Sequence, residues 1–314
     1  MSALAKLSET LSNADFKSIP IIDLTDARSA DEEKRRVVAM SIREACLNAG
    51  FFYIKNHGVS EDVVDATFSQ SKMFFDAPAE IKKSVDITKS ENFRGYMGLL
   101  VSNNDPSVST KGDMHEAFNL GLDPSLDPSS FDQIVKEGEL KHSENLWPSE
   151  EIWDGAGEFT KHPAAIMRLL FYHALGEKEA DELMPGIGSH TDFECFTILR
   201  QSFCDVPSAL QVQNRRGEWI DAPYIPETFV VNIGDQFARW TNDIFVSTRH
   251  RVLPALAKDR YSIPFFFGCD HDVPLLPPDT CVTVERPARY PVVTAGAYVF
   301  DRLSKAYKVE RSSL

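Results

Sequence analysis

Residues 190–199, His-Thr-Asp-Phe-Glu-Cys-Phe-Thr-Ile-Leu, combine a strand-like composition with a histidine and a carboxylate two positions apart. Successive side chains of a strand point to opposite faces, so we expect His190 and Asp192 to project side by side and Thr191 to point the other way. A neutral imidazole and a carboxylate placed in this way can bind one divalent metal ion. They require a third ligand from another part of the fold.

We predict that the third ligand is His250, which lies in residues 247–253, Ser-Thr-Arg-His-Arg-Val-Leu. Two histidines and one carboxylate on one side of an ion leave the opposite positions open, an arrangement typical of non-haem Fe(II) oxygenases. Zinc uses the same types of ligand. The three residues by themselves therefore leave the choice of metal open.

A strand with a receptor for an anion is predicted shortly after His250, at residues 260–267, Arg-Tyr-Ser-Ile-Pro-Phe-Phe-Phe. Strand alternation puts one set of side chains on the same face, namely Arg260, Ser262, Pro264 and Phe266. A guanidinium beside a hydroxyl suits a carboxylate, because the fork of donors matches its two oxygens. The chain thus has metal ligands followed by an anchor for a carboxylate.

These motifs together resemble the 2-oxoglutarate- and iron-dependent dioxygenases of the isopenicillin N synthase-like superfamily. Two further stretches fit that superfamily, residues 51–59 (Phe-Phe-Tyr-Ile-Lys-Asn-His-Gly-Val) and 230–236 (Val-Val-Asn-Ile-Gly-Asp-Gln). Residues 239–243 (Arg-Trp-Thr-Asn-Asp), followed by 247–252, are similar to the thymine hydroxylase and fungal gibberellin-oxidase-like branch. The resemblance extends from about residue 19 to about residue 307.

The resemblance implies a cofactor, a co-substrate and a reaction. Fe(II) is held by the three metal ligands named above, and the far carboxylate of 2-oxoglutarate is held by Arg260 and Ser262. Tyr172 places its hydroxyl on the co-substrate, with an ordinary core tyrosine as the alternative. O₂ is the other reactant. The substrate is a small organic molecule, such as a heterocycle or a secondary metabolite, which is hydroxylated or, by the same first step, desaturated or cyclised.

Many short apolar runs separated by turns predict a mainly β fold with flanking helices, a double-stranded β-helix or jelly roll. Helical periodicity predicts helices at residues 31–48, 63–75 and 295–308. Strands are predicted at residues 19–24, 51–54, 93–97, 116–120, 209–213, 218–221 and 229–233. We divide the chain into an N-terminal part of the same fold (1–160), the jelly-roll core (161–290), and a C-terminal helix and tail (291–314).

One segment departs from the superfamily pattern. Its members have a long helical stretch before the strand that precedes the metal motif, whereas here residues 158–161 lead almost directly into His162-Pro163. We prefer an alignment in which residues 167–172 form that strand, with Arg168 and Tyr172 on one face. In the alternative, residues 166–175 end the long helix and the strand is absent.

The resemblance also indicates side chains that line the substrate pocket. We expect Tyr96 and Phe118, on the two short strands of its wall, and Phe266 to contact substrate. Aromatic residues in short strands are more often simply part of the core, which is the alternative for Tyr96 and Phe118. The other histidines have simpler roles: we expect His57 to bond backbone in a turn, and His115 and His142 to be exposed to solvent.

Composition limits the cellular setting. The chain has 314 residues, 43% of them hydrophobic, which is enough for a sizeable core, and its net charge is −14. An acidic chain without a basic run is a poor ligand for nucleic acid or anionic membranes. Five cysteines without paired spacing are typical of a reducing compartment. Residues 1–17 have no apolar stretch suited to a secretory signal or a membrane span, so we predict a cytoplasmic protein of undetermined oligomeric state.

Two other functions remain open at this point. An iron oxidase of the same fold can use Arg260 and Ser262 to hold a carboxylate of a different molecule. Alternatively, loss of helices near Thr160 leaves a sheet face uncovered, and the chain is then a truncated, inactive or partner-binding form.

Overall fold

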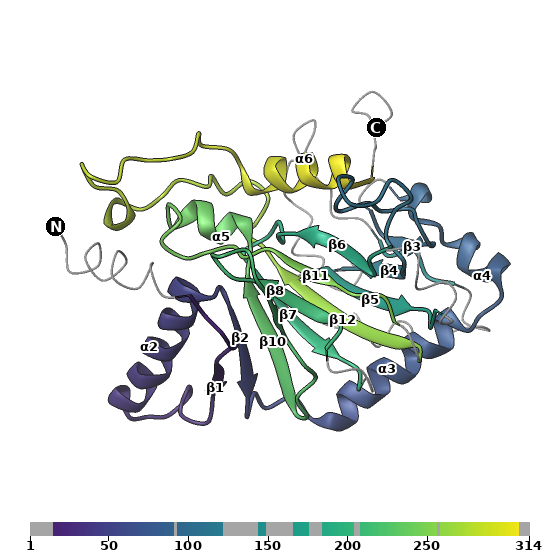
Figure 1. Ribbon diagram of the computed structural model, residues 1–314, viewed down its shortest axis with the longest axis horizontal. Coiled ribbons are helices and arrows are strands. Elements are labelled where there is room, and N and C mark those ends of the chain that lie inside the picture. The colour runs from purple at the N-terminus through teal and green to yellow at the C-terminus, as the bar shows by residue number, and fades with distance from the viewer. Residues whose placement is uncertain are drawn as a thin grey trace.

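The predicted apolar runs form the strands of two β-sheets (Figure 1). The computed structural model describes residues 15–90, 93–121, 144–148, 166–175, 184–203, 208–255 and 258–307. The eight strands of the large sheet are, in spatial order, β1 (Ile21–Asp23), β2 (Phe51–Lys55), β10 (Thr228–Ile233), β7 (Phe196–Gln201), β12 (Arg260–Phe267), β5 (Ile166–Tyr172), β4 (Glu116–Leu120) and β3 (Gly95–Met97). The four strands of the small sheet are β6 (Ile187–His190), β11 (His250–Val252), β8 (Leu210–Gln213) and β9 (Trp219–Asp221).

The main core lies between the two sheets. Leu170 and Tyr172 on β5 and Val230 on β10 belong to one apolar cluster with Leu210 and Val212 on β8. Pairing is antiparallel wherever the described strands meet, except between β1 and β2 at the edge. Two facing, mostly antiparallel sheets are the double-stranded β-helix, or jelly roll, which confirms the predicted fold class.

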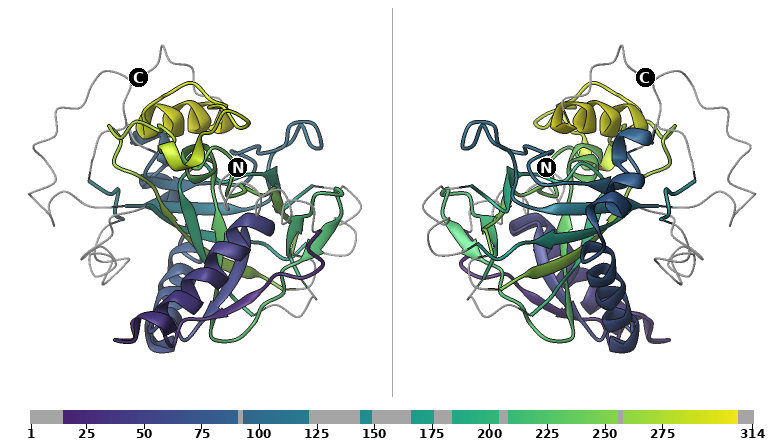
Figure 2. Two further views of the ribbon diagram at one scale, coloured as in Figure 1. Left: turned by 90° about the vertical axis from the view of Figure 1, so that its left-hand side faces the viewer. Right: turned by 90° about the vertical axis from the view of Figure 1, so that its right-hand side faces the viewer.

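Two helices cover the outer face of the large sheet. The helix α2 (Glu32–Asn48) packs its buried side chains against β2 and β10, and α3 (Glu61–Phe75) packs Phe74 and Phe75 against β4 and β5. Figure 2 shows α2 toward the viewer on the left and α3 toward the viewer on the right. These two helices thus cover much of the described outer face, which opposes the prediction of an uncovered sheet there. The segment near Thr160 lies outside the described residues.

Local sequence explains where α2 begins and ends. The Asp31 side chain accepts a hydrogen bond of 3.0 Å from the Glu33 N–H, which caps the first turn. The helix stops where Gly50 adopts a φ of +64° and donates its N–H to Ala45 O, a conformation that glycine reaches without strain. The predicted helix at 31–48 is confirmed.

The remaining helices are short or terminal. They are α4 (Ala79–Ser84), α5 (Asp235–Trp240), α6 (Ala295–Tyr307), and the 3₁₀ turns η1 (Ile87–Lys89) and η5 (Asp279–Cys281). The predicted C-terminal helix is confirmed as α6, which lies across the top of the view in Figure 1. Within the described ranges, no helix is long and apolar enough to cross a membrane.

The expected continuous strand at 190–199 is wrong. The small sheet ends at His190 in β6, and the large sheet begins at Phe196 in β7. The chain must cross from one sheet to the other between these residues, so it forms a loop and Asp192 is not in a strand. By contrast, residues 166–172 form β5, which confirms the preferred alignment over the helical one.

The large sheet takes strands from both sides of residue 160. Strands β1 to β4 come from the N-terminal part, and two of them pair directly with the core: β2 with β10, and β4 with β5. The N-terminal part therefore belongs to the same sheet as the core. The three-part division of the chain, with boundaries at 160 and 290, stays a prediction.

Candidate active site

Three side chains converge where the small sheet meets the crossing loop. His190 ends β6, His250 begins β11, and the two residues are register partners on adjacent strands. Asp192, from the loop, places Oδ1 at 3.6 Å from Nε2 of each histidine. One ligand atom from each lies within 4.8 Å of the others. Two bonds of about 2.1 Å to one ion span at most about 4.2 Å, so the two separations of 3.6 Å fit a single ion.

Backbone carbonyls orient both imidazoles. Nδ1 of His190 donates to Gly188 O at 2.7 Å, and Nδ1 of His250 donates to Thr248 O at 3.1 Å. The tautomer set by these bonds leaves the lone pair of each Nε2 facing the shared point, as metal-binding histidines require. Burial, and then the nearby His250, lower the pKa of His190 to about 4, so its ring is neutral at physiological pH.

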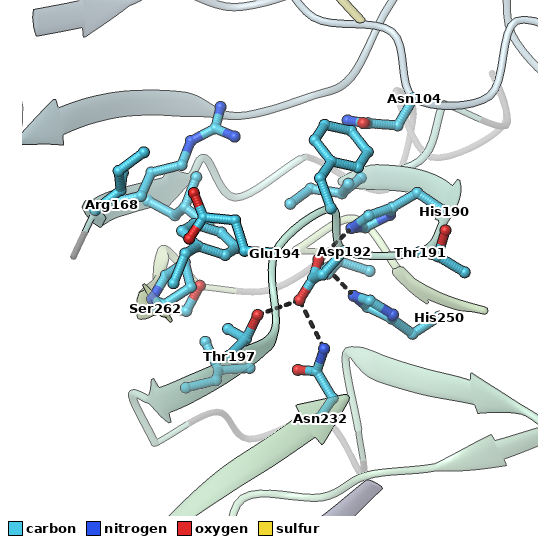
Figure 3. A pocket seen from close by; sticks show the side chains of 18 of the residues that line it. Asn104, Arg168, His190, Thr191, Asp192, Glu194, Thr197, Asn232, His250 and Ser262 are labelled. Carbon is cyan, nitrogen blue, oxygen red and sulfur yellow. Dashed lines mark hydrogen bonds and ion pairs between the residues drawn. The ribbon is translucent and has the colours of Figure 1, made fainter. Parts of the chain in front are cut away.

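The Asp192 carboxylate is held by its other oxygen. Oδ2 accepts hydrogen bonds from Asn232 Nδ2 at 2.6 Å and from the Thr197 hydroxyl, shown as dashed lines in Figure 3. Burial alone would raise the pKa of Asp192, but the two histidines and these hydrogen bonds lower it below its usual value. The group is therefore an anion with Oδ1 free for an ion. Sequence reasoning missed Asn232, although it lies within the quoted stretch 230–236.

The loop that carries Asp192 is clamped by backbone hydrogen bonds. Asp235 N–H donates to Asp192 O at 2.8 Å, and Cys195 N–H donates to Phe267 O at 2.9 Å. Gly234 approaches so closely that a Cβ added there would collide with the Glu194 carbonyl oxygen. The loop thus holds its side chains in place although it lies between two strands.

A cavity of about 140 Å³ opens beside these three residues, between the two sheets. The inward faces of β5 and β12 form one wall, and Val299, Leu303 and Ala306 of α6 close another side. The polar side chains that line it include Asn104, Asn119, Arg168, Glu194, Arg260 and Ser262. Burial raises the pKa of the Glu194 carboxyl to about 7, with the buried Arg94 opposing the shift.

The predicted anchor for a carboxylate lies in this cavity. Arg260 is 2% exposed, and Nη2 donates to Gln201 Oε1 at 2.9 Å, whereas Nη1 is buried and has no partner among the described residues. The Ser262 hydroxyl lies 3.5 Å from the Tyr172 hydroxyl, and the Tyr172 ring lies 4.8 Å from the guanidinium carbon of Arg260. A buried guanidinium N–H without a partner is costly, so this end of the cavity suits an anion. Gln201 gave no signal in the sequence.

Two of the three predicted substrate contacts are wrong. Phe266 lines the cavity, but Tyr96 and Phe118 do not: they belong to the apolar cluster beneath α3, on the outer face of the sheet. The alternation of β4 explains the error, because the inward side chain is the adjacent Asn119 rather than Phe118. The alternative interpretation of the two aromatics as core residues is correct.

His115 is also corrected, since it is 1% exposed instead of facing solvent. Its Nδ1 donates to Gly186 O at 2.9 Å, and its Nε2 lies 3.2 Å from Nη2 of Arg168, from which it accepts. Burial, and then Arg168, lower the pKa of His115 to about 4. The neutral ring thus orients Arg168 toward the cavity wall. His57 accepts from the Val59 N–H as predicted, and His142 lies outside the described residues.

Comparison with known proteins identifies the fold and the chemistry. Residues 164–268 match the 2OG-Fe(II) oxygenase superfamily, and residues 19–150 match the family described as non-haem dioxygenase in morphine synthesis N-terminal. A homoarginine-6-hydroxylase of Arabidopsis thaliana is 30% identical over 92% of this chain and 94% of its own. A 2-oxoglutarate-dependent dioxygenase of Penicillium crustosum is 32% identical over 84% of this chain and 89% of its own.

Solved structures agree with these sequence relatives. The crystal structure of a full-length Neurospora crassa protein in complex with alpha-KG and thymine has a TM-score of 0.76 and 27% identity, and covers 91% of this chain and 96% of that one. The names of the relatives fit use of 2-oxoglutarate and not an oxidase without it. The types of ligand and the unpartnered guanidinium agree with these similarities. The chain therefore belongs to the 2OG-Fe(II) oxygenase superfamily, whose members are oxidoreductases that use Fe(II), 2-oxoglutarate and O₂.

Proposed function

We propose that His190, Asp192 and His250 bind the Fe(II), that Arg260, Ser262 and Tyr172 bind 2-oxoglutarate, and that a small organic molecule is oxidised in the adjoining cavity. The observation that carries the proposal is the unpartnered Nη1 of Arg260, buried in the same cavity as three converging metal-ligating side chains. The metal ligands and the anion receptor thus share a single enclosed space.

The metal ligands of this chain are prepared before an ion arrives. Both imidazoles are held by backbone carbonyls at Nδ1, and Asp192 is held as an anion by Asn232 and Thr197. When bound, Fe(II) and 2-oxoglutarate activate O₂ for oxidation of a C–H bond. His190, Asp192 and His250 would hold such an ion by three protein ligands and would leave further positions for other ligands.

The receptor for 2-oxoglutarate is preorganised in the same way. Gln201 holds Nη2 of Arg260, and Nη1 stays without a partner among the described residues. The hydroxyls of Ser262 and Tyr172 add donors next to it. A flexible dicarboxylate bound between this receptor and the metal ligands has its orientation determined at both ends, which positioning catalysis requires.

The apolar lining excludes water from the reacting centre. Ile187, Leu199 and Leu210 line the cavity from the strands, and Leu303 lines it from α6. An apolar lining that excludes water would prevent side reactions with solvent. The oxidation is then directed to a C–H bond of the bound substrate. The relatives act on different substrates. Together they support oxidation of a small molecule, but not a particular substrate.

The test is anaerobic reconstitution of the full chain with Fe(II), followed by titration with 2-oxoglutarate. We expect an iron–2-oxoglutarate charge-transfer absorption band, and succinate release that a substrate from a small-molecule screen stimulates under O₂. A protein that binds iron without producing the band supports the oxidase alternative. A non-cooperative melting curve by circular dichroism supports the truncated, inactive form.

We also infer a cytoplasmic location. The sulfur atoms of Cys195 and Cys269 stand 3.4 Å apart as free thiols. Such closely placed thiols stay reduced in a reducing compartment. Labelling of these two cysteines in protein isolated under thiol-trapping conditions tests the inference, and an isolated Cys195–Cys269 disulfide would contradict it.

A further inference from the structure

The Glu194 carboxylate lines the cavity and forms no direct ion pair with the described residues. Glu194 lines the cavity together with Arg168 and the metal-ligating loop. Among the residues that the structure describes, none donates a hydrogen bond to its side chain, and none forms an ion pair with it. Figure 3 shows the carboxylate on the side of the cavity where Arg168 and Ser262 lie, away from His190 and His250. A buried carboxylate without a hydrogen bond or a direct ion pair is costly, and a ligand that supplies such a contact would offset the cost.

The backbone around Glu194 holds this side chain in position. Its carbonyl oxygen accepts from the Gln236 N–H at 3.2 Å and is approached closely by Gly234. On the other side, a Cβ added at Gly268 would stand 3.0 Å from Glu194 Oε2. The Glu194 carboxylate thus packs against Gly268, and the Glu194 backbone packs closely against Gly234. Its direction into the cavity is a property of the folded loop.

A second acceptor without a donor lines the same cavity. Asn119 donates from Nδ2 to Phe93 O at 2.9 Å, which fixes its amide orientation, and its Oδ1 is buried without a partner in the described part of the chain. Asn119 and Arg168 are register partners on β4 and β5. Among the described residues, two that line the cavity thus have an acceptor without a donor, one of them a carboxylate, and they come from separate parts of the chain.

We propose that Glu194 and Asn119 determine substrate specificity by binding a cationic nitrogen group of the substrate, a protonated amine or a guanidinium. A protonated amine and a guanidinium each carry a positive charge and several N–H donors. The Glu194 carboxylate and the Asn119 amide oxygen lack such donors among the described residues. A guanidinium presents a planar fork of N–H donors, whereas an ammonium presents a point charge. The inference rests on the proposed function, because it concerns the substrate of that same cavity.

A structural role is the competing explanation. Arg94 is buried, with Nε and Nη1 lacking partners among the described residues, and its charge favours the ionised form of Glu194 without forming an ion pair with it. Arg94 does not line the cavity. If Glu194 only neutralised Arg94, its replacement would lower stability and leave ligand preference unchanged.

The test uses full-length protein loaded with Fe(II) and 2-oxoglutarate in the absence of O₂. Calorimetry measures the dissociation constants of three probes of similar length: n-pentylammonium, n-pentylguanidinium and the neutral 1-hexanol. We expect the two cations to bind at least about tenfold more tightly than the alcohol, as one charge-assisted hydrogen bond provides. In Glu194→Gln that preference is lost, while the affinity for 1-hexanol and for 2-oxoglutarate is unchanged.

Glu80→Gln is the matched control, because Glu80 is exposed on α4 and its replacement removes the same charge far from the cavity. This variant should keep the wild-type preference. Equal binding of cations and alcohol by the wild-type protein overturns the inference even if Glu194→Gln fails to fold. So does a Glu194→Gln protein that melts at lower temperature but still prefers cations. Failure of all proteins to form the iron–2-oxoglutarate absorption band rejects the proposed function itself, and the inference with it.

Discussion

The two terminal nitrogens of the Arg260 guanidinium have different surroundings. Nη2 is bound to Gln201, and Nη1 is buried with no partner in the described ranges. The neighbouring Ser262 and Tyr172 bring hydroxyls to the same end of the cavity. Because an unpaired buried donor costs about 1–3 kcal/mol, a carboxylate that binds here gains from an interaction that the empty protein cannot make.

Replacing Arg260 therefore separates co-substrate binding from metal binding. In Arg260→Leu we expect the dissociation constant for 2-oxoglutarate to rise about 100-fold, since a charge-assisted contact of about 1.5–3 kcal/mol is lost. Iron affinity should be unchanged. Titration of the anaerobic iron–2-oxoglutarate absorption band measures both. Arg251→Leu is the control, because Arg251 stacks on Trp219 of the small sheet, outside the cavity; equal effects in the two variants would contradict the assignment.

We expect Asn232 to affect metal binding through Asp192. Its amide holds the oxygen of Asp192 that faces away from the two histidines. In Asn232→Ala we expect about 10- to 100-fold weaker iron binding, because a metal-ligating carboxylate loses its orienting partner. Competition against a chelator under anaerobic conditions gives the affinity. Thr197→Val removes the other hydrogen bond and should have an effect of the same sign; wild-type affinity in both variants would count against orientation through Asp192.

At the scale of elements, the end of α2 is joined to the segment that leads into β11. Gly50 follows the helix and accepts from the Ile233 N–H through its carbonyl, while Thr248 donates its hydroxyl to Ala49 O at 2.7 Å. The segment 246–248 therefore rests directly on Gly50. Two residues later the chain reaches His250, so the position of one metal ligand depends on this close approach.

Gly50→Ala tests that approach. An added Cβ would collide with Val246 O and stand 2.8 Å from Thr248 Oγ1, at a φ of +64°. We expect a loss of about 3 kcal/mol or more in the free energy of unfolding, from strain and from displaced backbone. Gly58→Ala is the matched control, with a φ of +85° but nothing within 4 Å, and should cost only about 1–2 kcal/mol. Urea unfolding measures both, and equal losses would show that the approach is unimportant.

At the scale of the whole molecule, a buried charge network ties the outer helices to the sheet. Glu116 on β4 is bound by Lys82 at 2.8 Å, by the Tyr96 hydroxyl at 2.5 Å and by His173 at 2.5 Å. Lys82 belongs to α4 and His173 follows β5. One carboxylate thus joins three segments that are distant in sequence, on the face opposite the cavity.

This network predicts a pH dependence of stability. Burial alone would raise the pKa of Glu116, but the hydrogen bonds from Lys82, Tyr96 and His173 lower it below 4.5. A lowered pKa contributes stability that is complete above about 4.5 and is lost as pH falls through the folded-state pKa. Glu116→Gln should cost about 3 kcal/mol at pH 7, and the difference from wild type should shrink toward pH 3. Thermal melts of both proteins from pH 7 to pH 3 measure this difference in stability. A difference that does not change with pH would contradict the mechanism.

The sequence by itself determined the features that depend on neighbours along the chain. Strand alternation was enough to put Arg260, Ser262 and Phe266 on the inward face of β12, and helical periodicity was enough to predict α2. The sequence also predicted which three residues, His190, Asp192 and His250, come together as candidate metal ligands. These features follow from backbone geometry and side-chain chemistry over a few residues, so no knowledge of distant segments is needed.

Only the tertiary structure decided which faces look inward and where the chain changes sheets. Asp192 reaches the histidines from a loop because β6 and β7 belong to different sheets. Phe118 packs beneath α3 and His115 is buried because elements far away in the sequence cover them. Burial depends on contacts between such segments, and a short stretch of residues carries no record of what will lie on top of it.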